Sequence, residues 1–222
     1  LTIPKGSVVA LVGLSGCGKS TTASLLMRFC DAAAGHIYMD GKDYHSMKPE
    51  ELRKHIAMVP QQVNLFSGTI RENLLLADPD ADDQTLMEAV KEAGLLKFVQ
   101  SLENGLDSDI GNAGASLSGG QRQKMGIARA LLSKAEYMIF DEATSSVDPE
   151  SEKEIWETIG HLAHTRTLII ISHRMSSVRG ADCIYVLKDG RVAQQGDHET
   201  LMAQDGLYHE LVIRQQAMEV AE

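Results

Sequence analysis

The sequence has little cysteine, and the cysteines that it has are poorly placed for a structural role. The 222 residues contain three of them, Cys17, Cys30 and Cys183. An odd number at wide spacing offers neither a disulfide framework nor the paired ligands of a zinc site. We therefore expect reduced thiols, as in a cytosolic protein.

Long apolar runs are also missing. No stretch approaches the ~18 residues that a membrane helix needs, and the most apolar segment, Leu168 to Ile171, is short. No signal-peptide pattern opens the chain. Because the chain starts at Leu1, inside a segment that resembles a turn leading into a strand, we interpret it as part of a longer polypeptide.

Basic residues are the third shortage. Lys and Arg number 21 against 31 Asp and Glu, which gives a formal net charge of −10. Non-specific nucleic-acid binding needs cationic side chains that neutralise phosphates. The balance argues against a nucleic-acid partner, although a local group of positive charges can still hold a nucleotide.

The chain alternates short apolar runs with segments of helical spacing, and its middle part is helical. The predicted strands are residues 8–12, 36–39, 56–59, 137–140, 167–171, 183–187 and 192–195. Glu72 stands at the capping-box offset from Thr69, and Asp189-Gly190 is a hairpin signal between the last two of these strands. The predicted helices are residues 19–29, 50–54, 69–76, 82–93, 95–102, 120–132, 149–161, 198–203 and 207–216. This rhythm predicts an α/β fold with a mostly parallel sheet flanked by helices. We expect one domain with a core of residues 1–67 and 131–222 and an inserted α-helical subdomain of about 68–130.

A glycine-rich loop lies between the first predicted strand and the first predicted helix. Its string Gly13-Leu-Ser-Gly-Cys-Gly18-Lys19-Ser20 fits the pattern G-x-x-x-x-G-K-[ST], which is rare by chance in a chain of this length. Glycines let backbone N–H groups converge on phosphate oxygens, and a helix N-terminus adds positive charge. Lys19 is expected to reach the phosphates, and the Ser20 hydroxyl to bind Mg²⁺. The predicted phosphate-binding residues are Gly13, Leu14, Ser15, Gly16, Cys17, Gly18, Lys19, Ser20 and Thr21.

Two acidic residues end the predicted strand at 137–140. Asp141 can hold Mg²⁺ at the end of that strand, and Glu142 can act as the general base that deprotonates an attacking water. The alternative is that the strand ends in solvated carboxylates. The glycine-rich loop in the same chain favours the catalytic interpretation.

A third string resembles the signature of the ATP-binding-cassette (ABC) ATPases. It is Leu117-Ser-Gly-Gly-Gln121, followed by Arg-Gln-Lys-Met-Gly-Ile-Ala-Arg-Ala, and the resemblance extends from Leu1 to the last predicted helix. It implies a P-loop NTPase core and a head-to-tail dimer, in which each ATP lies between the loop of one copy and the signature of the other. Ser118, Gly119, Gly120 and Gln121 would then act in trans. Ser118 could also be a plain helix cap, and the two roles are compatible.

Further residues match motifs of the same family. Gln61 resembles the Q-loop glutamine that contacts Mg²⁺, although the adjacent Gln62 leaves the register open by one residue. His173 resembles the switch histidine that touches the γ-phosphate, although a lone histidine is often only structural. Ser145 to Asp148 resembles the D-loop at the dimer seam, with Ser146 and Val147 departing from the usual Ala-Leu. The resemblance thus implies catalytic roles for Glu142, His173, Lys19 and Gln61, and Mg²⁺ ligation by Ser20, Gln61 and Asp141.

Two stretches resemble exporters with fused membrane domains. They are Leu65 to Asn73 and Asp109 to Gly114, in which Asn112 and Ala113 replace the usual Glu and Arg. The implied cofactors are ATP and Mg²⁺. The implied partners are a second nucleotide-binding domain and a transmembrane domain, at the cytoplasmic face of a membrane.

Three other functions remain open at this point. An ABC importer ATPase would share the same motifs, but not the exporter-like stretches. A chromosome or DNA-repair ABC ATPase would carry long coiled coils, whereas fewer than a hundred residues separate Lys19 from Leu117. A regulatory module without hydrolysis is disfavoured by the presence of Glu142 and His173.

Overall fold

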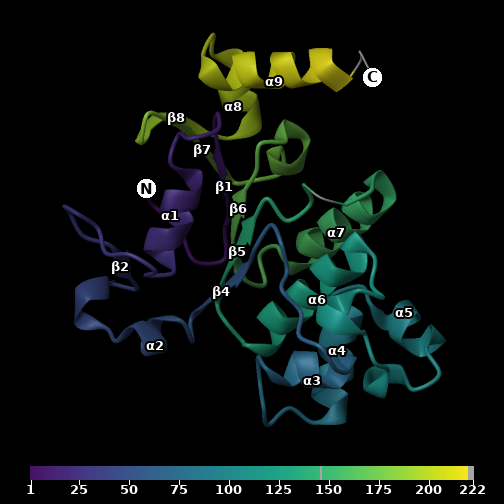
Figure 1. The fold of residues 1–222 in the computed structure, drawn as a ribbon. Coiled ribbons are helices and arrows are strands. Elements are labelled where there is room, and N and C mark those ends of the chain that lie inside the picture. Colours follow the sequence, from purple (N-terminus) through teal and green to yellow (C-terminus); the bar gives the residue numbers. More distant parts are fainter. Residues whose placement is uncertain (146, 220–222) are drawn as a thin grey trace. The chain divides into compact units, whose positions relative to one another are not determined.

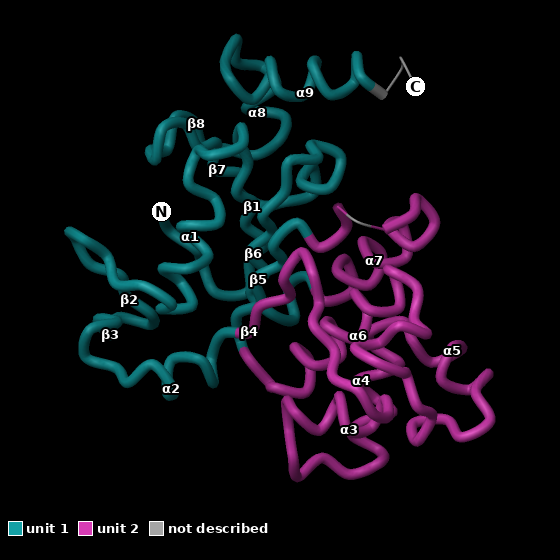
Figure 2. The backbone as a smooth tube through the Cα atoms, in the orientation of Figure 1, with its two compact units in different colours: residues 1–56, 136–142, 163–222 teal, residues 57–135, 143–162 magenta. Residues whose placement is uncertain are grey.

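The computed structural model describes residues 1–145 and 147–219, and the chain forms two compact units within it (Figure 2). Unit 1 contains residues 1–56, 136–142 and the chain from 163 onward, and unit 2 contains residues 57–135 and 143–162. Ser146 of the predicted D-loop lies outside the described residues. In the described part of the chain, no helix has both the length and the apolar character that a bilayer crossing requires.

A mostly parallel sheet forms the centre of unit 1 (Figure 1). Its order is β5-β6-β1-β7-β8, and the first four of these strands are parallel. Val9 of the central strand pairs with Ile169 on one side and with Cys183 on the other. The strands are β1 (Val8–Val12), β5 (Tyr137–Asp141), β6 (Thr167–Ile171), β7 (Cys183–Lys188) and β8 (Arg191–Gly196).

Every residue of β1 and β6 is buried, as expected for strands that are covered on both faces. Strand β8 is antiparallel to β7 and mostly exposed, and the two are joined at the predicted hairpin turn of Asp189 and Gly190. Both turn residues have positive φ, 50° and 73°, as tight hairpin turns require. The predicted α/β class with a mostly parallel sheet is confirmed.

The strand β4 (Ile56–Val59) matches its predicted range and starts at the last residue of unit 1. Just before it, the His55 carbonyl accepts a hydrogen bond of 3.0 Å from the N–H of Tyr137, the first residue of β5. A separate two-stranded hairpin joins β2 (Tyr38–Met39) to β3 (Lys42–Asp43). The strand predicted over 36–39 is therefore shorter, and its partner was not predicted.

The helices of unit 1 are α1 (Lys19–Leu26), α2 (Pro49–Leu52), α8 (His198–Ala203) and α9 (Leu207–Glu219), with short 3₁₀ turns η1 (Tyr44–Ser46) and η4 (Met175–Val178). Helix α1 ends three residues before the predicted Phe29, because Arg28 takes a left-handed conformation with φ 51°. Phe29 then stays exposed, and the Arg53 guanidinium lies 5.3 Å from its ring centre. Helix α9 continues three residues past the predicted end at 216.

Unit 2 is built around one long helix, α6 (Gly119–Leu132), which contacts α3, α4 and α7. Its residues Met125, Ile127 and Ala128 are fully buried, so this helix is covered on more than one face. The other elements are α3 (Ile70–Leu75), α4 (Asp83–Glu92), α5 (Leu96–Ser101), α7 (Pro149–Leu162), η2 (Gly105–Asp107) and η3 (Asn112–Gly114). The extent of about 68–130 for a helical subdomain stays a prediction.

Candidate functional site

The glycine-rich loop has the backbone that a phosphate cradle requires. Gly13, Gly16 and Gly18 all have positive φ, at 148°, 79° and 110°. A side chain on Gly13 would collide with the Leu187 carbonyl and would come within 2.7 Å of Cys17 Sγ. Gly18 precedes α1 and offers no side-chain cap, so the first N–H groups of this helix remain available to a ligand.

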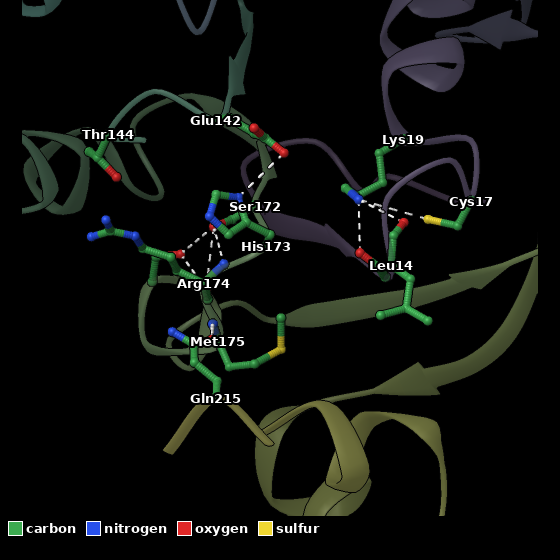
Figure 3. A network of polar contacts seen from close by, with 12 residues as sticks. Leu14, Cys17, Lys19, Glu142, Thr144, Ser172, His173, Arg174, Met175 and Gln215 are labelled. Atoms are coloured by element: carbon green, nitrogen blue, oxygen red, sulfur yellow. Dashed lines mark hydrogen bonds and ion pairs between the residues drawn. The ribbon is translucent and has the colours of Figure 1, made fainter. Parts of the chain in front are cut away.

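Lys19 is a buried cation whose hydrogen-bond partners are neutral. Lys19 is only 7% exposed. Its Nζ donates to the carbonyls of Gly13 at 2.8 Å and Leu14 at 3.2 Å (Figure 3). Cys17 Sγ lies 3.9 Å from the same nitrogen. Over residues 1–145 and 147–219, no carboxylate forms an ion pair with Lys19. A buried charge is costly without a counter-charge, so this loop fits an anion such as a phosphate.

The carboxyl ends of β5 and β6 bring three predicted residues together. The Glu142 N–H donates to the Ile171 carbonyl at 2.9 Å, and His173 Nδ1 lies 3.4 Å from Glu142 Oε1 (Figure 3). Glu142 has a φ of 49°, a conformation that costs energy outside glycine and is often found at functional sites. The His173 side chain remains 53% exposed, so its ring is open to a ligand.

Asp141 directly precedes Glu142, and its carboxyl is affected by the charges of Glu142 and Lys19. Burial raises the pKa of Asp141 above its ordinary value, the charge of Glu142 raises it further, and Lys19 lowers it. Two adjacent carboxylates offer the oxygen ligands that a hard divalent ion prefers. Mg²⁺ at nucleotide sites takes one or two protein oxygens and completes its shell with phosphates and waters. Ser20, which is exposed at the start of α1, and Asp141 can supply such oxygens.

The predicted signature lies in unit 2 and forms the N-terminus of α6. Ser118 Oγ accepts a hydrogen bond from the Gln121 N–H at 3.2 Å, and Gln121 Oε1 accepts one from the Ser118 N–H at 2.8 Å. This capping box confirms the prediction that Ser118 caps the helix. The N–H groups of Gly119 and Gly120 have no acceptor within the helix, so they remain available to an external acceptor.

The predicted Q-loop also lies in unit 2, and its backbone is attached to α6. Gln123 Nε2 donates to the Pro60 carbonyl at 3.0 Å, and Arg129 Nη1 donates to the Asn64 carbonyl at 2.7 Å. A side chain on Gly126 would come within 2.6 Å of Val63. Gln61 and Gln62 are both exposed, so the one-residue choice between them stays open.

These contacts of α6 were missed at the level of sequence. Gln123, Gly126 and Arg129 all belong to the string that follows the signature, but no role was assigned to them. Their spacing of three residues places them on one helix face. That spacing was the available signal, although the sequence alone does not say which segment this face contacts.

The two exporter-like stretches lie side by side within unit 2. The Ile110 N–H donates to the Gly68 carbonyl at 2.9 Å, and the Ile70 N–H donates to the Ser108 carbonyl at 3.2 Å. Ser67 Oγ donates to Asn112 Oδ1 at 3.2 Å. Asn112 therefore makes a neutral contact at a position where the resemblance leads one to expect a charge.

The comparisons with known proteins agree with this geometry. Residues 1–145 match the family described as ABC transporter. The chain is 46% identical over 95% of its length to the ABC-type transporter kk1G of Curvularia clavata, of which it covers 16%. It is 45% identical over 95% of its length to the ATP-dependent lipid A-core flippase of Chromobacterium violaceum, of which it covers 36%.

A solved structure shows the same fold. It is a bacterial Atm1-family ABC exporter with ATP bound, and it superposes with a TM-score of 0.90 at 41% sequence identity. The match covers 96% of this chain and 37% of that protein. The chain thus spans about a sixth to a third of the length of its relatives. On the family match and on these identities, the chain belongs to the ABC transporter family.

Proposed function

We propose that this chain binds ATP with Mg²⁺, hydrolyses it, and thereby powers the export of a substrate across a membrane. The observation that carries the proposal is the buried Lys19 ammonium, which has carbonyl partners but no carboxylate among the described residues. A polyphosphate supplies the missing negative charge. Relatives named as transporters and as a flippase support the export role.

The residues of unit 1 divide the work of hydrolysis. The loop N–H groups and Lys19 bind and orient the phosphates. Ser20 and Asp141 would hold Mg²⁺, which would neutralise charge that develops on the phosphate oxygens. The Glu142 carboxylate accepts the proton of the attacking water. His173, whose Nδ1 faces Glu142 at 3.4 Å, keeps its other ring nitrogen free for a phosphate oxygen.

A second copy of the domain completes this scheme. The Ser118 and Gln121 side chains satisfy each other's backbone, so the anion-binding capacity at the start of α6 rests on Gly119 and Gly120. Two uncharged N–H donors are too few to bind a triphosphate alone, but they can complement the loop of another copy. The proposed partners are this second copy and a transmembrane domain, with the chain at the cytoplasmic face of the membrane.

The substitution Glu142→Gln tests the proposed chemistry, because it keeps the shape of the side chain and removes the base. ATP hydrolysis should fall at least about 100-fold, a typical share for general-base catalysis. ATP binding should be retained, and the dimer should persist in the ATP-bound form. Phosphate release measures the rate, and gel filtration with ATP measures the dimer.

Glu136→Gln provides a matched control for that experiment. Glu136 directly precedes β5, while Glu142 directly follows it, and its carboxylate pairs with Lys5. This control should hydrolyse ATP at the wild-type rate. A Glu142→Gln protein that also keeps the normal rate would refute the assignment of the base.

A further inference from the structure

The segment that carries His173 is a short loop between β6 and η4, and its first part is fixed by local bonds. The Ser172 N–H donates to the Leu11 carbonyl of β1 at 3.3 Å, and the Arg174 N–H donates to Ser172 Oγ at 2.9 Å. Ser177 Oγ donates to the same hydroxyl oxygen at 2.9 Å. These bonds tie the start of the loop to the sheet and fold it into a turn.

The other end of the loop is held by a residue forty positions later in the chain. The Met175 N–H donates to Oε1 of Gln215 on α9 at 2.7 Å (Figure 3). A backbone N–H can only donate, so the carbonyl oxygen of the amide must face it. The bond closes the loop two residues beyond His173, and the Met175 side chain is 3% exposed.

Helix α9 is itself well anchored on the side that bears Gln215. Tyr208 and Val212 are 0% and 1% exposed, and they precede Gln215 by seven and three residues, which places all three on one helix face. The Tyr208 N–H donates to Gln194 Oε1 at 2.9 Å, and its hydroxyl lies 2.8 Å from His198 Nδ1. Gln215 therefore extends from a helix that is fixed within unit 1.

We propose that Gln215 is a positioning residue for His173, holding the backbone of Met175 so that the histidine ring stays beside Glu142. His173 touches Glu142 at one ring nitrogen and is otherwise exposed, so its place depends on the backbone on both sides. The sheet holds one side, and on the other side the Met175 N–H is bound by Gln215, beside the bond from Ser177 Oγ to the Arg174 carbonyl. The inference rests on the proposed function, because it assigns Gln215 to the hydrolysis carried out by Glu142 and His173.

The test measures kcat and KM for ATP hydrolysis by the full-length protein carrying Gln215→Ala. Loss of the acceptor should lower kcat by about tenfold, because small misplacements of catalytic groups cost that much or more. KM for ATP should change little, since the glycine-rich loop is untouched. Gln215→Glu should retain most of the rate, because a carboxylate oxygen also accepts the Met175 N–H.

Gln216→Ala is the matched control, since Gln216 is the next residue of α9 and is exposed. It should keep the wild-type kcat. A second control repeats Gln215→Ala in a His173→Ala background, where it should cause no further loss, because the two residues act through one another.

Two results would overturn the inference while leaving the proposed function intact. One is an equal kcat for Gln215→Ala and Gln216→Ala. The other is an undiminished tenfold loss in the His173→Ala background, which would mean that Gln215 acts elsewhere. Absence of hydrolysis by the wild-type protein would instead refute the proposed function, and this inference with it.

Discussion

Two helix N-termini of this chain present backbone N–H groups without a partner inside the helix, and the residues around them differ. Helix α1 follows Gly18, which offers no side-chain cap, and its first residue is the buried cation Lys19. Helix α6 follows Ser118, whose capping box with Gln121 satisfies part of the helix end without any charge. The first N-terminus suits a polyphosphate, whereas the second can only add a few neutral donors to an anion held elsewhere.

A side chain would meet neighbouring atoms at both Gly13 and Gly120, but Gly13 is required for its backbone conformation as well. Gly13 has a φ of 148°, so its backbone conformation alone disfavours any other residue. Gly120 is helical, but a side chain there would come within 2.5 Å of Ser151 at the start of α7. The first glycine shapes a loop, and the second lets two segments of unit 2 pack closely.

The largest expected effect is a loss of ATP affinity on removal of Lys19, the charged residue that distinguishes the N-terminus of α1 from that of α6. Lys19→Ala should weaken ATP binding by roughly 100-fold, because bonds to a charged donor contribute about 3 kcal/mol. The free energy of unfolding should decrease little, since the substitution removes a buried charge that no carboxylate of the described chain contacts. Calorimetric titration with ATP and thermal unfolding measure the two quantities.

Lys42→Ala is the control for this prediction, because Lys42 is an exposed lysine of β3 in the same unit. It should bind ATP as the wild type does. If Lys19→Ala bound ATP equally well, the buried ammonium would not be the phosphate ligand.

The next effect concerns the packing of Gly120. Gly120→Ala should destabilise unit 2 by about 1–3 kcal/mol, the usual range for overpacking. Adding Ser151→Gly should restore most of the loss, because it removes the atoms that the new side chain meets. Urea unfolding of the single and double variants measures both values.

Gly160→Ala in α7 is the matched control, because a side chain there meets nothing within 4 Å. It should be neutral or stabilising by up to about 1 kcal/mol, as expected for Gly to Ala in a helix. Similar destabilisation by the two alanines would contradict the steric explanation for Gly120.

The smallest expected effect distinguishes a cap from a ligand site. Among its described residues, unit 2 has capping boxes of Ser118 with Gln121 at α6 and of Thr69 with Glu72 at α3. Ser118→Ala and Thr69→Ala should each cost about 1 kcal/mol of stability. With both variants still folded, ATP hydrolysis should fall only with Ser118→Ala, because this cap fixes the helix end at which Gly119 and Gly120 are proposed to bind ATP. If Ser118→Ala and Thr69→Ala lost hydrolysis equally, Ser118 would act only as a helix cap.

The sequence predicted most of what depends on local chemistry. The loop from Gly13 to Gly18, the caps at Thr69 and Ser118, and the hairpin at Asp189 follow from residue types whose preferences act over a few positions. The structure confirms each of these local features. Their roles toward ATP and Mg²⁺ stay proposals.

The features that were missed depend on contacts between distant residues. Helix α1 stops early because Arg28 turns left-handed and donates to the Tyr44 carbonyl at 2.7 Å, a partner sixteen residues away. The bond between Gln215 and Met175 spans forty residues. Propensity and periodicity describe neighbours along the chain, so they could not reveal which distant backbone atoms these side chains would reach.

Helix α6 contacts the predicted Q-loop along its side and carries the predicted signature at its N-terminus. Gln123 and Arg129 donate hydrogen bonds to the backbone of residues 60–64, and Gly119 and Gly120 are the first residues of the same helix. A displacement of the loop around Gln61 must therefore either break these hydrogen bonds or move α6 as well. An effector that engages the loop and an anion at the helix end would then modify each other's affinity by the same factor, as reciprocity demands.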